Sequence, residues 1–270
     1  MRLLGQSFSK MIECYHPYVP GATQVILRQF LHCDPVGISY LLGCGGKSTG
    51  VVVDAVAEPG TYLQAAADAG MKIDYVIDTH VHADHLSTGP ALADAAGAAY
   101  VLSAKADVVL PFKGVEDGDE IRVGNVVIKV LETPGHTPEH ISLLVTDRTR
   151  AEEPWLALTG HTLMIGDLGR TELAESAEAG ARNLFRSVRT LKSLPDYLPL
   201  LPGAFAGSAC GRGLSATPLS TIGFEKRHNA AFGIDDEAAF VRFMLSDMPP
   251  APPEAARLRA ANSGRNPDEI

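Results

Sequence analysis

The sequence has no apolar run that approaches the ~18 residues of a membrane-spanning helix, and this excludes a helical integral membrane protein. Its N-terminal stretch also lacks the continuous hydrophobic segment of a signal peptide, because Gln6, Ser7 and Lys10 interrupt it. We therefore expect a cytoplasmic protein without a membrane partner.

Cysteine is scarce, and basic residues are in the minority. The four cysteines, Cys14, Cys33, Cys44 and Cys210, form no CxxC pair, which is typical of reduced thiols and not of a disulfide framework. Lys and Arg number 23 against 32 Asp and Glu, and the net charge is −9. A field of this sign repels phosphate backbones, so we expect no nucleic-acid partner.

The composition is that of a folded α/β protein. With 46% hydrophobic and 20% charged residues, the chain is neither disordered nor collagen-like. From Val36 to about Leu201, short runs rich in Val, Ile, Leu and Thr alternate with helical patterns. The predicted strands are residues 37–42, 50–56, 75–79, 99–103, 126–132, 141–146 and 155–159. The predicted helices are residues 61–69, a segment between Thr88 and Gly97, and residues 183–194 and 236–246.

The length suggests one large domain or two small ones, at ~150 residues per domain. The order of the motifs favours a single domain over residues 27–247, after an N-terminal extension over residues 1–26. Residues 248–270 begin with a proline-rich stretch and continue as a polar tail, which is typical of a linker or of a terminus that wraps the surface.

The strongest chemical signal is the segment His80-Val-His82-Ala-Asp84-His85, which directly follows a predicted strand. Alternation along an extended segment places His80 and His82 on the same side, and a turn can bring Asp84 and His85 towards a neighbouring position. Imidazole suits iron, zinc, copper and nickel. Four such groups within six residues predict a site for one or two divalent metals.

Two later turns repeat the pattern of a strand followed by a ligand-type residue. Pro134 and Gly135 favour a sharp turn that presents His136, which is a good third ligand. For His140, at the start of the next strand, we favour a structural role. The third turn, Thr159-Gly-His161, would be a weak signal alone, but the recurrence strengthens it.

Together these motifs resemble the metallo-β-lactamase fold superfamily. Within it, further segments resemble persulfide dioxygenases, especially the bacterial branch that is often fused to rhodanese-type sulfurtransferase domains: residues 136–142, 166–170, 207–211 and 220–227. The resemblance covers roughly residues 27–262 and implies an α/β fold of the α+β kind, an αββα four-layer sandwich with the metal site at one edge between two sheets. It also implies one non-haem Fe(II) per chain and an oxidoreductase that adds O₂ to a low-molecular-weight thiol persulfide, giving sulfite and the thiol.

The resemblance also implies roles for individual residues. The family's three iron ligands fall on His80, His136 and the position that His161 occupies here. His82, Asp84 and His85 would be catalytic groups that orient the ligands and the bound water or substrate.

Two positions depart from the family pattern. His161 stands where the family has an aspartate, and Ala204 stands where it has a histidine. In two-metal hydrolases of the superfamily, that aspartate bridges the two metals and that histidine completes the second site. Here only Asp84 and His85 would remain for a second ion, so we expect one metal. Three histidines form a neutral set that should raise the Fe(III)/Fe(II) potential, and the set also suits zinc. Three interpretations of His161 stay open: iron with an altered reduction potential, a switch to zinc, and a site with weakened metal binding and little activity.

Three further residues are candidates for substrate binding. Arg170 or Arg212 could meet a substrate carboxylate with two parallel hydrogen bonds, and the alternative for each is a structural salt bridge. Cys210 could carry sulfane sulfur for a time, and its alternative is a buried inert thiol.

Three functions remain in competition. The first is oxidation by O₂ of a persulfide of glutathione, cysteine or coenzyme A. The second is a zinc-dependent, glyoxalase-II-like thioester hydrolase, in which metal-bound hydroxide attacks a carbonyl. The third is a weakly active or inactive sulfur-binding or regulatory protein. The resemblance implies that a homodimer is possible. Because the chain ends at Ile270, we expect any sulfurtransferase partner to be a separate polypeptide.

Overall fold

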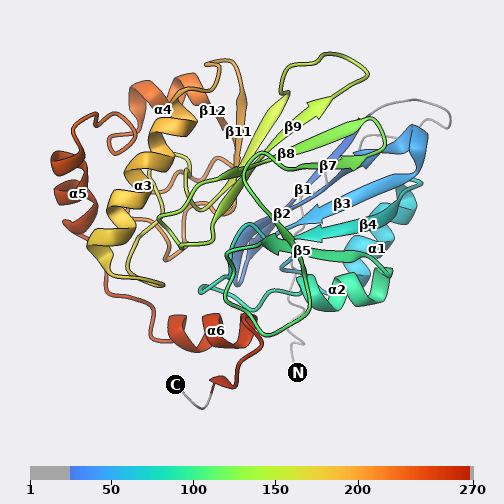
Figure 1. The fold of residues 1–270 in the computed structure, drawn as a ribbon, viewed down its shortest axis with the longest axis horizontal. Helices are drawn as coiled ribbons and strands as arrows, with labels where there is room; N and C mark the ends of the chain where they lie inside the picture. The colour runs from blue at the N-terminus through green and yellow to red at the C-terminus, as the bar shows by residue number, and fades with distance from the viewer. Residues whose placement is uncertain (1–24, 268–270) are drawn as a thin grey trace, which may run out of the picture.

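Two six-stranded β-sheets form the centre of the computed structural model, which describes residues 25–267 (Figure 1). The first sheet has the order β1-β2-β3-β4-β5-β6. Its strands are β1 (Val25–Cys33), β2 (Val36–Cys44), β3 (Thr49–Val53), β4 (Lys72–Ile77), β5 (Ala99–Ser103) and β6 (Lys113–Val115). The pairs β1–β2 and β2–β3 are antiparallel, and β3 to β6 are mutually parallel.

The second sheet has the order β12-β11-β10-β9-β8-β7. Its strands are β7 (Glu120–Val123), β8 (Val126–Glu132), β9 (Ile141–Asp147), β10 (Leu156–Gly160), β11 (Pro199–Pro202) and β12 (Ser220–Thr221). All neighbouring pairs are antiparallel except β10 and β11, which run parallel.

Helices cover the outer face of each sheet (Figure 1). Helices α1 (Pro59–Asp68) and α2 (Gly89–Ala96) pack on the first sheet. Helices α3 (Ala177–Lys192) and α4 (Ile222–His228) pack on the second, and α5 (Glu237–Leu245) packs against α3. The last helix, α6 (Ala255–Asn262), is short and follows a proline-rich stretch. None of the helices between residues 25 and 267 has the length and apolarity that crossing a bilayer requires.

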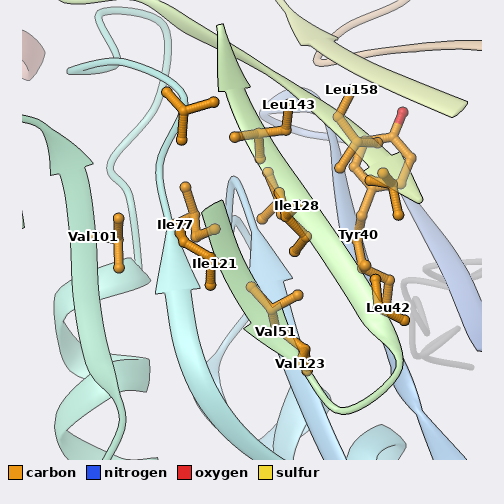
Figure 2. Close-up of a cluster of buried hydrophobic side chains, with 14 of the residues drawn as sticks. Tyr40, Leu42, Val51, Ile77, Val101, Ile121, Val123, Ile128, Leu143 and Leu158 are labelled. Atoms are coloured by element: carbon orange, nitrogen blue, oxygen red, sulfur yellow. The ribbon is translucent and has the colours of Figure 1, made fainter. Parts of the chain in front are cut away.

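Side-chain alternation in the strands explains the layers. In β2, Tyr40 and Leu42 face the second sheet, whereas Leu41 between them packs towards α1 and α2. Figure 2 shows this inter-sheet core, in which Val51 and Ile77 of the first sheet meet residues of the second. Four layers follow, and the predicted αββα sandwich is confirmed.

The local predictions hold where sequence signals are strong. Helix α2 begins after Thr88, has Pro90 in its first turn, and ends at Gly97 in the left-handed conformation (φ 61°). Helix α5 begins after Asp236, whose side chain accepts a hydrogen bond from the Ala239 amide.

Other local predictions need correction. The strand predicted for residues 50–56 ends at Val53, because Asp54 has a positive φ of 52° that breaks the extended backbone. The polar tail contains a helix, α6, that the sequence pattern missed, since its residues show almost no amphipathic contrast. Most of the predicted N-terminal extension lies outside the described residues, and its last two positions belong to β1.

Candidate metal centre

The predicted metal-binding histidines come from loops that follow three different strands. His80 follows β4, His136 follows β8 and His161 follows β10. Such strand ends are the usual position of sites in sheet-based folds. The structure brings one ring nitrogen of each of these three residues to within 4.8 Å of the others, and all three side chains are buried.

A chain of hydrogen bonds orients His80. The Asp54 carboxylate accepts hydrogen bonds from the Thr79 amide (2.7 Å) and the Thr79 hydroxyl (3.0 Å). That hydroxyl lies 2.9 Å from His80 Nδ1 and can accept its proton. Nε2 is then the unprotonated nitrogen, and it is buried with no hydrogen-bond partner among the described residues. His80 is therefore fixed in the tautomer that a metal requires.

His136 is fixed in the same way by a backbone carbonyl. Its Nδ1 donates to the Arg170 carbonyl oxygen at 2.7 Å, which leaves Nε2 with a free lone pair. Nε2 lies 3.3 Å from His161 Nδ1. Two nitrogens bound to one ion at 2.0–2.1 Å are roughly 3.0–3.4 Å apart when they are adjacent ligands. The observed distance fits a shared metal ion.

His161 depends on a glycine and on His140. Gly160 has a φ of +50°, and a Cβ there would lie 2.5 Å from His140 Nε2, so a side chain is excluded. The close approach lets the His161 amide donate to His140 Nε2 at 3.1 Å. His140 Nδ1 lies 3.0 Å from both the Thr133 and the Thr162 hydroxyls. Both nitrogens of His140 are thus engaged, which favours the structural role.

His82, Asp84 and His85 form a second group whose ligand atoms also lie within 4.8 Å of one another. His82 Nε2 is 3.3 Å from Asp54 Oδ1, and His85 Nδ1 is 3.1 Å from Asp84 Oδ1. Burial acts to lower the pKa of His82, but the Asp54 carboxylate outweighs it and raises the pKa to about 9. In the metal-free state His82 is a cation held between acidic groups.

The buried nitrogens of the three-histidine group are uncharged at neutral pH. Burial, reinforced by the neighbouring imidazoles, holds the pKa of His80 well below its usual value and lowers that of His136 to about 3. Burial also lowers the pKa of His161. Metal ligation needs neutral imidazole, so no deprotonation cost opposes binding at these residues near neutral pH.

Unsatisfied polar atoms gather around this centre. The buried side-chain atoms without a hydrogen-bond partner in residues 25–267 are Asp78 Oδ1, His80 Nε2, His82 Nδ1 and Nε2, Asp84 Oδ2, His85 Nε2 and Thr137 Oγ1. Buried polar atoms without partners are costly and few in native proteins. Their concentration beside His80, His136 and His161 suits a metal ion, and ring nitrogens of these three histidines are close enough to one another to share it.

The structure gives the two candidate substrate-binding arginines internal partners. Arg170 donates to the Glu172 carboxylate (2.6 Å) and to the carbonyls of Ala209 and Pro249 (2.9 and 2.7 Å), and it is 1% exposed. Arg212 forms an ion pair with Asp167 at 2.8 Å. These contacts use their hydrogen-bond donors within the chain and favour the structural alternative for both.

Cys210 lies beside the centre and is buried. Its Sγ lies within 4.8 Å of ligand atoms of Asp84 and His161. Burial raises the pKa of the thiol well above its usual value. On the other side it packs with Met164, Ala204 and Leu214, so the methyl group of Ala204 is part of an apolar wall.

Sequence reasoning missed two residues of α6 that hold the loop of residues 80–85 from a distance. Asn262, on α6, donates from Nδ2 to the carbonyls of His82 (2.8 Å) and His85 (2.7 Å), and its Oδ1 accepts from the Ser87 amide. Arg259, also on α6, donates to the Val81 carbonyl at 2.8 Å and pairs with the buried Glu139. No local signal at these positions could reveal contacts that join residues about 180 positions apart.

The fold and the histidine centre define a class. Residues 36–198 match the model of the metallo-beta-lactamase superfamily, and the chain belongs to this superfamily. The relatives below include enzymes of more than one kind.

Two kinds of relative are similar to this chain. The mitochondrial persulfide dioxygenase ETHE1 of Homo sapiens is 32% identical over 171 residues, which cover 61% of each chain. The hydroxyacylglutathione hydrolase of a Synechococcus strain is 33% identical over 157 residues, covering 56% of this chain and 59% of the relative. The chain thus spans about three fifths of the length of these curated relatives.

Solved structures extend the similarity over more of the chain. A metallo-beta-lactamase from Staphylococcus aureus superposes with a TM-score of 0.84 at 36% identity, covering 88% of this chain and 72% of that one. ETHE1 from Myxococcus xanthus superposes with a TM-score of 0.76 at 30% identity, covering 88% of this chain and 99% of that one.

Proposed function

We propose that this protein is a non-haem iron persulfide dioxygenase that oxidises a low-molecular-weight thiol persulfide to sulfite and the thiol. The observation that carries the proposal is the set of three buried, neutral imidazoles, each with a ring nitrogen within 4.8 Å of the others. The similarity to ETHE1 from Myxococcus xanthus over almost all of that chain supports the choice of reaction. Fe(II), if held by His80, His136 and His161, would supply the activation of O₂ and the binding of the persulfide anion.

The residues of the chain would set the charge around the metal ion, keep the histidine rings in the ligating tautomer and exclude water. His80, His136 and His161 bring no negative charge, so the positive charge of the ion remains available to attract a persulfide anion. Asp54, through Thr79, and the Arg170 carbonyl keep two of these rings in the ligating tautomer. The apolar wall of Met164, Ala204 and Cys210 limits water on one side.

A cavity of about 490 Å³ is a candidate for the part of the substrate that carries the persulfide. Glu139 and Arg259 line it, and both also contact Val81, the residue between His80 and His82. Lys105 and Arg265 also line it, and they would exchange their present partners Glu132 and Asp107 for a carboxylate of glutathione or a phosphate of coenzyme A. A homodimer and a separate sulfurtransferase partner remain parts of this proposal, and so does a cytoplasmic location.

The test combines metal analysis with O₂ consumption. Protein purified without O₂ and supplied with iron should hold Fe and consume O₂ when glutathione persulfide or coenzyme A persulfide is added. The matched variant is His161→Asp, which converts the three-histidine set into two histidines and a carboxylate. If iron-loaded protein consumes no O₂ with persulfide while His161→Asp does, the proposal is wrong for the sequence as it stands.

A zinc-dependent thioester hydrolase is the second candidate. The specific observation in its favour is the three-histidine set, which is a common ligand set of catalytic zinc. The similarity to hydroxyacylglutathione hydrolases also supports it. Bound zinc with cleavage of a glutathione thioester, and no O₂ uptake, would select this function. Absence of both activities in metal-loaded protein would select a sulfur-binding or regulatory role.

A further inference from the structure

Glu139 is a buried acidic residue in the loop that carries two histidines of the metal centre. It lies three residues after His136 and directly before His140, and it is 3% exposed. It belongs to none of the candidate ligand groups in residues 25–267, so metal ligation does not explain its burial. A charged group is buried at a high cost unless it is paired and hydrogen-bonded. Its partners therefore indicate what Glu139 does.

The Glu139 side chain reaches across to the loop that follows β4. Its Oε1 accepts a hydrogen bond from the Val81 amide at 2.9 Å. The backbones of the same two loops also meet, because the Ile141 amide donates to the Thr79 carbonyl at 2.9 Å. Glu139 thus joins the loop of His136 to the peptide unit that directly follows His80.

Arg259 of α6 completes this arrangement. Its Nη1 donates to the Val81 carbonyl at 2.8 Å and to Glu139 Oε1 at 3.1 Å, and its Nη2 donates to Glu139 Oε2 at 3.1 Å. The two parallel bonds between guanidinium and carboxylate give this ion pair a defined geometry. The amide of Val81 belongs to the peptide unit next to His80, and its carbonyl belongs to the peptide unit next to His82. The ion pair therefore holds the backbone on both sides of Val81.

The orientation of these peptide units determines where the His80 ring points. The Thr79 hydroxyl holds this ring through Nδ1 at 2.9 Å, and Glu139 and Arg259 hold the backbone that follows it. A rotation of the peptide unit after His80 would move its ring relative to His136. Metal–ligand distances tolerate deviations of only about 0.2 Å, so a small rotation is enough to weaken binding.

We propose that Glu139 and Arg259 are positioning residues of the metal centre. Their ion pair fixes the backbone of Val81 and thereby the placement of His80 relative to His136, although neither residue ligates the ion. The C-terminal helix α6 is then part of the metal centre through Arg259. The inference rests on the metal centre of the proposed function, but it does not depend on which reaction that centre catalyses.

The test measures metal affinity, ligand geometry and stability in the same variants of the full-length protein. Metal-free protein is titrated with Co²⁺ and with Zn²⁺ against a chelator of known affinity, the visible absorption of bound Co²⁺ reports its coordination geometry, and denaturant titration gives the free energy of unfolding. Glu139→Ala removes the acceptor of the Val81 amide. It should lower metal affinity by about 10–100-fold and change the Co²⁺ spectrum. Arg259→Met removes the donor to the Val81 carbonyl and should lower metal affinity by at least about tenfold.

Glu139→Gln separates positioning from stability. It keeps an oxygen for the Val81 amide but loses the charge that pairs with Arg259. It should therefore destabilise the metal-free protein, as Glu139→Ala does, yet bind Co²⁺ with nearly the affinity and spectrum of the wild type. Arg265→Met is the matched control, because Arg265 lines the same cavity as Arg259 but pairs with the exposed Asp107. It should leave metal affinity and spectrum unchanged.

Wild-type affinity and spectrum in folded Glu139→Ala overturn the proposal, and so does a Glu139→Gln that loses as much affinity as Glu139→Ala. If Glu139→Ala fails to fold, Arg259→Met decides in its place: weaker binding with a changed spectrum supports the proposal, and wild-type binding overturns it. O₂ uptake with glutathione persulfide is measured on iron-loaded wild type. Metal binding without O₂ uptake refutes only the dioxygenase, whereas wild-type metal binding in Glu139→Ala refutes only the positioning role.

Discussion

Two buried polar clusters in this molecule differ in how completely their hydrogen bonds are satisfied. We call Asp167, Arg170, Glu172 and Arg212 the arginine cluster. Each of its charged groups has an opposite charge or a carbonyl within hydrogen-bonding distance. We call His80, His82, Asp84, His85, His136 and His161 the histidine cluster. There, five of the atoms that could ligate a metal are buried without a partner.

This difference distinguishes a cluster that stabilises the fold from a cluster that could bind a ligand. The arginine cluster ties distant segments together, since Arg170 holds the carbonyls of Ala209 and Pro249, and Arg212 holds Asp167 and the carbonyl of Phe243. A complete cluster of this kind needs nothing from outside. In the histidine cluster, Nε2 of His80 and Oδ2 of Asp84 are buried without a hydrogen-bond partner among the described residues, and a bound metal ion would supply one. Substitutions in the two clusters should therefore fail in different ways.

The largest expected effect is on metal binding in the histidine cluster. His80→Ala removes a ligand that Asp54 and Thr79 hold in place. We expect metal affinity to fall by more than about 100-fold, beyond the 10–100-fold typical of residues that only support ligands. Competition with a chelator of known affinity measures this. Retention of wild-type affinity would mean that the metal binds elsewhere.

Substitutions in the arginine cluster should lower the stability of the protein but leave its metal binding unchanged. Arg212→Met leaves the carboxylate of Asp167 buried without its ion-pair partner. Breaking one side of a buried pair costs about 3–5 kcal/mol, so the free energy of unfolding should fall by that order. Denaturant titration measures it, and the folded variant should still bind metal at His80, His136 and His161. The exposed Arg182→Met, which removes pairs with Glu178 and Glu237, is the control and should change stability little.

A substitution at Asn262 should lower both stability and metal affinity, since Asn262 lies on α6 and holds the loop of residues 80–85. Asn262→Ala leaves the carbonyls of His82 and His85 without their donor. We expect a loss of about 1–3 kcal/mol in stability and of about 10–100-fold in metal affinity. Denaturant titration and chelator competition are the measurements.

Two variants define what Asn262 does. Asn262→Asp keeps an acceptor for the Ser87 amide but loses the two donated bonds, so it should resemble Asn262→Ala. Arg257→Ala, an exposed change on the same helix, should leave metal affinity unaltered. If Asn262→Asp restores wild-type affinity, the donated bonds do not position the loop.

The smallest effect concerns pH and the metal-free protein. The pKa of His136 is about 3 in the folded state against 6.5 when unfolded, so the unfolded chain binds more protons between these values. Stability should therefore fall as the pH drops below 6.5, by about 1.4 kcal/mol per pH unit for each such histidine. The pKa of His82 is about 9, so its contribution is present below pH 6.5 and is lost as the pH rises towards 9.

Stability of the metal-free protein should thus be greatest near pH 6.5, as measured by denaturant titration across pH. His136→Gln should flatten the acidic side of the profile and His82→Gln the alkaline side. Identical profiles in both variants would show that these two histidines are not buried as the structure places them.

The ligand-bearing loops were predictable because their signals are local. His80, His82, Asp84 and His85 lie within six residues, and His136 follows a Pro-Gly turn, so strand, turn and ligand can be read together. Helix α2 was predictable for the same reason, since its cap and stop lie within ten residues of each other. Strands β1, β6, β7, β11 and β12 were not predicted; of these, β6 and β12 have only three and two residues and so carry no periodic pattern.

The amino-acid sequence by itself determined the fold class and the candidate ligands, because alternation of apolar residues and the spacing of histidines are properties of neighbouring positions. Only the tertiary structure decided what surrounds those ligands. It placed Cys210 beside Asp84 and His161, turned the two arginines towards internal partners, and brought Asn262 onto the carbonyls of His82 and His85. Apart from the Arg170–Glu172 pair, these contacts join residues between 31 and 180 positions apart in the chain, and contacts over such separations depend on how the layers pack.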